Sequence, residues 1–157
     1  MNSKTIISKI AHILATFFYV GYTPKMPGTV ASLITMIMVY FLPIVSVMYS
    51  VILVGILLVG GVIVSGIFEK ELGVKDPSVI VIDEVAGMLL ALLCTPKTIV
   101  CYLLAFGLFR FLDIYKPFPI NIPDKHMTGG WGIMLDDILA GFITGLSMLL
   151  WSYFLVY

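Results

Sequence analysis

Five acidic residues occur at the ends of strongly apolar stretches of the sequence. They form two adjacent pairs and one single position: Asp83, Glu84, Asp113, Asp136 and Asp137. A carboxylate beside hydrocarbon costs several kcal/mol unless it is paired, solvated or bound to a cation. Carboxylate oxygens without a cluster of Cys or His favour Mg²⁺ over Zn²⁺. We therefore predict that the five acids organise a shared magnesium site.

Basic residues stand next to one of these acids. Arg110, Asp113 and Lys116 recur at intervals of three, so they lie on one helical face until Pro117 ends the regular pattern. Cations beside a divalent metal suit a phosphate group that bridges metal and protein. The plainer interpretation is a ladder of charges that only satisfy one another.

Another segment that could contribute to anion binding lies at the start of an apolar stretch. Residues 23–29, TPKMPGT, precede an expected helix. The free N–H groups at Gly28 and Thr29, the positive end of the helix and Lys25 together could bind a phosphate. Proline and glycine also occur in ordinary interhelical loops, so this segment carries little weight alone.

The composition indicates an integral membrane protein. Of the 157 residues, 61% are hydrophobic and only 11% are charged, where a soluble domain has roughly a quarter. Charged residues are absent from 26–68 and 138–157, and the first run is long enough to cross a hydrocarbon core of roughly 30 Å twice. The net charge of zero argues against nucleic acid as a partner.

The predicted fold is all-α, a polytopic helical bundle with about five membrane-embedded helices. We expect a single domain over 1–157, in which 1–21 form an amphipathic N-terminal helix and 22–157 form the catalytic bundle. The expected membrane helices are 30–42 and 47–68, joined by a turn at Pro43 and Ser46, then 78–94 and 98–115, and finally 132–157. Residues 116–131 read as a polar loop. In the last helix, Gly141 and Gly145, with Ala140 and Thr144 beside them, form a smooth face suited to tight helix packing. The short helices 78–94 and 98–115 are the ones whose full crossing stays open.

The distribution of basic residues predicts the orientation. If all five helices cross, Lys97 lies alone on one side, and the other side holds Lys4, Lys9, Lys25, Lys70, Lys75, Arg110, Lys116 and Lys125. The crowded side is cytoplasmic by the positive-inside tendency. All five acids fall on that same side.

Four segments resemble the signature blocks of the phosphatidylglycerophosphatase A family. They are GYTPKMPGTVASL at 21–33, IDEVAGM at 82–88, FRFLDIYKPFPI at 109–120 and GGWGIMLDDILAG at 129–141, in the order of the family. The resemblance implies Mg²⁺-dependent removal of the terminal phosphate of phosphatidylglycerophosphate, giving phosphatidylglycerol in the bacterial inner membrane. It also implies that Lys25, both acidic pairs, Asp113, Arg110 and Lys116 are motif positions.

The resulting hypothesis is a multi-pass phospholipid phosphatase whose active site faces the cytoplasm. The five acids would hold Mg²⁺ and its activated water, while Lys25, Arg110 and Lys116 grip the phosphate. Direct attack by water is preferred, with an aspartyl-phosphate intermediate left open. The alternatives are an ion- or proton-coupled transporter, whose site usually lies near the bilayer midplane, and a structural membrane subunit. The sequence does not decide which acids ligate the metal or whether one ion or two bind. It also leaves open the headgroup selectivity and the oligomeric state.

Overall fold

Every regular element in the described part of the chain is helical. The structure is a computed structural model that describes residues 3–43 and 46–156. Its elements are α1 (Ser3–Ala15), the 3-10 helix η1 (Val20–Tyr22), α2 (Pro27–Phe41), α3 (Val47–Leu72), α4 (Ile82–Leu93), α5 (Ile99–Tyr115), α6 (Asn121–His126) and α7 (Gly130–Val156). The prediction of an all-α fold is confirmed. The turn residues 44 and 45 and the expected helix end at Tyr157 lie outside the described residues.

Two of the described helices are long and apolar enough to cross a membrane. They are α3 over Val47–Leu72 and α7 over Gly130–Phe154. Only 17% of the most apolar part of α3 is buried inside the protein, so this helix exposes hydrocarbon side chains along most of its surface. The core helix of a soluble protein would be mostly covered, and α3 therefore favours a lipid environment.

The predicted spans 78–94 and 98–115 are shorter than expected, whereas 30–42 corresponds to α2, which has 15 residues. α4 has 12 residues and α5 has 17. At 1.5 Å per residue, α4 is about 18 Å long, against a hydrocarbon core of roughly 30 Å. The structure thus supports two spanning helices by length and composition, and the number five stays a prediction.

Several helix boundaries differ from the predicted ones for local reasons. α1 ends at Ala15, not near residue 21, because Phe17, Phe18 and Tyr19 have positive φ angles that stop the right-handed helix. α3 continues to Leu72 and ends at Gly73, which has a φ of 65°. The expected loop over 116–131 contains α6, which packs along the first turns of α7.

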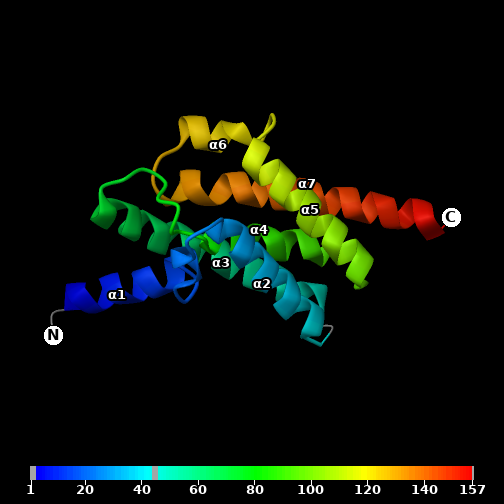
Figure 1. The fold of residues 1–157 in the computed structure, drawn as a ribbon, viewed down its shortest axis with the longest axis horizontal. Helices are drawn as coiled ribbons and strands as arrows, with labels where there is room; N and C mark the ends of the chain where they lie inside the picture. The colour runs from blue at the N-terminus through cyan, green and yellow to red at the C-terminus, as the bar shows by residue number, and fades with distance from the viewer. Residues whose placement is uncertain (1–2, 44–45, 157) are drawn as a thin grey trace.

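α4 lies at the centre of the bundle. Figure 1 shows α1 and the C-terminal end of α7 at opposite ends of the long axis, with α2 and α5 neighbours in front of α4. α4 contacts α2, α3, α5 and α7, and its contact with α7 is the most extensive of any helix pair. The N-terminal end of α4 is also tied to α1, because the backbone N–H of Val81 donates to the carbonyl of Ala15 at 2.9 Å. The start of α4 is therefore held from several directions.

Glycines let α4 and α7 approach until their backbones touch. A Cβ on Gly87 would lie 2.6 Å from the carbonyl oxygen of Asp137, and one on Gly141 would overlap the carbonyl of Gly87. Further along, a Cβ on Gly145 would lie 3.3 Å from the carbonyl oxygen of Ala91. The small-residue face predicted for the last helix is thus confirmed as a tight helix seam. This seam brings the acidic pair of α7 beside the acidic pair of α4.

Candidate active site

Three of the five predicted acids converge on one point. Asp83 and Glu84 come from the first turn of α4, and Asp137 comes from α7, across the glycine seam. Each offers a carboxylate oxygen, and the three oxygens lie within 4.8 Å of one another. Asp137 is only 2% exposed and Asp83 is likewise buried. Three oxygens at this spacing, here called the carboxylate cage, are of the kind that a hard cation prefers.

The other two acids are paired with bases. Asp113 Oδ2 lies 2.5 Å from Arg110 Nη1, one helical turn away on α5. Asp136 accepts a hydrogen bond from Lys116 Nζ. Lys116 follows the last residue of α5 and has a left-handed backbone, with a φ of 43°. Asp113 and Asp136 are therefore positioned to hold the side chains of Arg110 and Lys116 beside the carboxylate cage.

Arg110 links three helices at the site. Besides Asp113 on its own helix, its Nη1 lies 3.7 Å from Glu84 Oε1 on α4 and donates to Ser32 Oγ on α2 at 3.4 Å. A guanidinium carries five donors in a fixed planar arrangement, so it can orient a carboxylate and still bind a second anion. Its Nε is buried and has no protein partner.

The start of α2 forms another wall. Met26 precedes the helix in a left-handed conformation and Pro27 begins it. A Cβ on Gly28 would overlap Glu84 Oε1, so any larger residue there would require the Glu84 side chain to move. The buried Thr29 Oγ1 has no hydrogen-bond partner. The predicted anion-binding helix end therefore faces the acids.

Most of the predicted site residues line one cavity of about 360 Å³. Those that line it are Gly28, Thr29, Asp83, Glu84, Arg110, Asp113, Lys116, Asp136 and Asp137. Lys25 does not line it: the residue is exposed and immediately precedes the wall at Met26. Its predicted role in phosphate binding stays a prediction.

The cavity also contains residues that the sequence reasoning missed. They are Met26, Pro27, Asp76, Ser78, Ile80 and Ile114. Asp76 and Ser78 lie in the connection between α3 and α4, where nothing in the local pattern indicated a site. Met26 and Ile114 are direct neighbours of predicted residues, and this adjacency was the available signal.

Burial and like charges act together on the acids at the start of α4. Asp83 is buried and directly precedes a second carboxylate, Glu84, so desolvation and like-charge repulsion both disfavour its ionised form. The positive charge of Arg110, whose Nη1 lies 3.7 Å from Glu84 Oε1, offsets part of this repulsion at Glu84. A bound cation would reverse this balance by favouring the ionised carboxylates.

The donor set fits a divalent cation. Two buried carboxylate oxygens, Glu84 Oε2 and Asp137 Oδ2, have no hydrogen-bond partner in the protein. Among the described residues, Asp83 and Asp137 form no ion pair with a basic side chain. Buried, unsatisfied oxygens of this kind are costly unless something answers them. An oxygen-preferring ion such as Mg²⁺ would do so.

The chain was compared with known proteins. The profile of the family "Phosphatidylglycerophosphatase A" matches residues 13–152. Phosphatidylglycerophosphatase A of Escherichia coli is 38% identical over 146 residues, which cover 91% of this chain and 84% of the relative. The protein of the same name from Haemophilus influenzae is 37% identical over 131 residues, covering 82% and 80%.

A third relative bears a different and provisional name. It is a Bacteroides thetaiotaomicron protein named as a phosphatidylinositol-3-phosphatase, 34% identical over 137 residues, covering 82% of this chain and 85% of the relative. No solved structure matches the chain significantly. With its family match over almost the whole length and its long alignments, the chain belongs to the phosphatidylglycerophosphatase A family.

Proposed function

We propose that this protein is a Mg²⁺-dependent lipid phosphatase of phospholipid biosynthesis. It would hydrolyse the terminal phosphate of phosphatidylglycerophosphate, giving phosphatidylglycerol and inorganic phosphate. The observation that carries the proposal is the convergence of Asp83, Glu84 and Asp137 beside Arg110 and Lys116 in one cavity of a member of this family. The relatives reported above bear the names of phosphatases, so the transporter alternative is not favoured.

The residues divide into two groups by what they contact. Asp83, Glu84 and Asp137 would hold the metal, while Arg110 and Lys116, fixed by Asp113 and Asp136, would bind the phosphoryl oxygens. When bound, Mg²⁺ supplies charge neutralisation at the phosphate and activates water as the nucleophile. Arg110 would stabilise the charge that shifts onto the phosphoryl oxygens in the transition state. The N-terminal end of α2 adds backbone donors at Gly28 and Thr29.

The location proposed for this site is the cytoplasmic face of the bacterial inner membrane. Lys97 follows α4, while the acids occupy the first turn of that helix, so the isolated lysine and the site lie at opposite ends of α4. Lys97 donates to the carbonyl of Leu42, which places it beside the far end of α2 as well. The site therefore lies at the end of α4 away from Lys97, on the side where the sequence predicts most of the Lys and Arg residues. By the positive-inside tendency, that side is cytoplasmic.

Removal of the metal tests the proposal directly. Protein purified in detergent is expected to release inorganic phosphate from phosphatidylglycerophosphate in Mg²⁺, to lose this activity in excess EDTA and to regain it when Mg²⁺ is restored. A parallel assay with phosphatidylinositol 3-phosphate measures headgroup selectivity, since one relative is named for that lipid. Absence of phosphatidylglycerophosphate turnover, in detergent and in liposomes, would contradict the proposal.

Arg110 and Lys25 are expected to contribute to kcat/KM by different amounts. Arg110→Ala should lower kcat/KM by roughly 10²-fold to 10³-fold, the effect of losing a buried donor to transition-state charge. Lys25→Ala should lower it less than about tenfold, because an exposed charge outside the cavity is screened by solvent. Lys70→Ala, which removes an exposed lysine near the end of α3, is the control. Equal losses for Lys25→Ala and Arg110→Ala would contradict this assignment.

A further inference from the structure

The cavity has an apolar side as well as a charged floor. Met26, which precedes α2, is 61% exposed, and Ile114, near the end of α5, is 56% exposed. Many apolar side chains of this protein are exposed, and exposure alone says nothing about a ligand. Met26 and Ile114 differ because they also line the cavity that contains the acids. They join the charged interior to the outer surface of the bundle.

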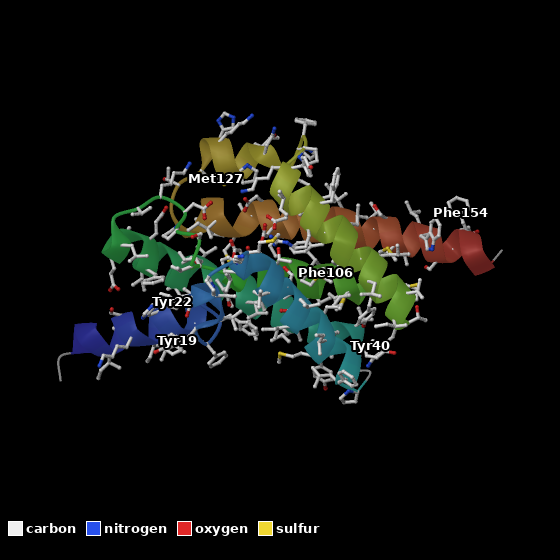
Figure 2. All side chains as sticks on the ribbon, viewed as in Figure 1. Tyr19, Tyr22, Tyr40, Phe106, Met127 and Phe154 are labelled. Carbon is white, nitrogen blue, oxygen red and sulfur yellow. The ribbon has the colours of Figure 1, made fainter. Side chains whose placement is uncertain are left out.

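Met26 directly precedes α2 and Ile114 lies on α5, and these two helices are neighbours along their length. Arg110 Nη1 donates to Ser32 Oγ across the pair at 3.4 Å, and Ile114 lies one helical turn beyond Arg110 on α5. Further from the site, Tyr40 and Phe106, labelled in Figure 2, pack against the same buried cluster.

Asp76, Ser78 and Lys116 also line the cavity and are polar. The cavity walls therefore include both polar and apolar surface.

A gap in the side chains of α5 continues the apolar surface. Gly107 is exposed, and a Cβ built there would have no heavy atom within 4 Å. Residues seven apart lie nearly on the same face of a helix. Gly107 therefore lies on the same face of α5 as Ile114, about two turns towards the N-terminal end of the helix. Glycine inside an exposed helix lowers its stability relative to alanine. Its open position leaves room for a chain of methylene groups.

We propose that the acyl chains of the substrate lipid leave the cavity across Met26 and Ile114 and lie along α5 past Gly107. This inference rests on the proposed function, because it needs a lipid phosphate in the acidic cavity. The phosphate binds to Arg110 and Lys116 beside the carboxylates that would hold the metal, and the hydrocarbon follows the apolar side into the bilayer. Burial of methylene groups against these residues then contributes to lipid binding.

The test compares a long-chain and a short-chain form of the same lipid. Dipalmitoyl phosphatidylglycerophosphate in mixed micelles and soluble dihexanoyl phosphatidylglycerophosphate are assayed with purified protein in Mg²⁺. The readout is the ratio of kcat/KM for the long-chain lipid to kcat/KM for the short-chain lipid. Gly107→Trp fills the gap on α5, and Ile114→Ser removes apolar surface at the cavity. The matched controls on α3 are Gly55→Trp, which also has open space at its Cβ, and Ile56→Ser, whose residue is similarly exposed.

The expected result is a fall of about tenfold in this ratio for Gly107→Trp and Ile114→Ser, mainly through a higher KM for the long-chain lipid. The α3 controls should keep the wild-type ratio. An unchanged ratio in both α5 variants, or an equal fall in the control variants, would overturn the proposal. Failure of the wild-type protein to hydrolyse either lipid would instead overturn the proposed function, so the two failures are distinguishable.

Discussion

Replacing Asp137 with Asn is expected to lower the rate of phosphate release at least about 10³-fold. The change keeps the size of the side chain and removes its charge at a position that is 2% exposed and within 4.8 Å of the Asp83 and Glu84 oxygens. Asn can offer only a neutral oxygen to a cation, so the cage loses both charge and metal affinity. Asp83→Asn removes the same kind of ligand and should have an effect of similar size. The measurement is phosphate release from phosphatidylglycerophosphate at saturating Mg²⁺.

A control separates loss of chemistry from loss of folding. Without metal, Asp137→Asn removes one of several like charges that repel one another, so its thermal unfolding in EDTA should occur at the wild-type temperature or above it. Added Mg²⁺ should stabilise the wild-type protein more than the variant, because an ion that binds only the folded state raises its stability. Glu71→Gln, which changes an exposed acid that accepts a hydrogen bond from Ser8, should leave the rate unchanged. A near-normal rate in Asp137→Asn would remove this residue from the site.

Replacing Gly141 with Leu is expected to lower the free energy of unfolding by at least about 3 kcal/mol. Already the Cβ would overlap the carbonyl of Gly87 on α4, and a backbone cannot rotate aside as a flexible side chain can. The two helices would have to separate along the seam that has the most extensive contact in the bundle. Denaturation in detergent micelles, followed by circular dichroism, measures the change.

The matched control for the seam is Gly55→Leu on α3, where a Cβ has open space. This variant should be as stable as the wild type or more so, because leucine favours the helix more than glycine does. Gly141→Ala should fall between the two, since it adds only the overlapping Cβ. The seam would be refuted as the critical contact if Gly141→Leu and Gly55→Leu were equally stable.

The helices themselves could be predicted because their signals are local. Long runs without charge indicated α2, α3 and α7, and small residues at helical spacing indicated a tight face on the last helix. The end of α1 could not be predicted, because Phe17, Phe18 and Tyr19 adopt left-handed conformations without glycine. Packing around this turn outweighs local preference, and single residues do not reveal such a conformation.

The candidate site, like the helices, could be predicted from the sequence only in part. Residue types and spacing were sufficient to name the acids and bases and the chemistry that they suit, because charges in apolar stretches need a cation or a partner. Only packing decided how the carboxylates are grouped: Asp83, Glu84 and Asp137 meet because glycines bring α4 against α7, while Asp113 and Asp136 pair with Arg110 and Lys116. Spacing along one helix says which residues share a face. It does not say how closely two helices approach, and that distance is what makes separate acids into one site.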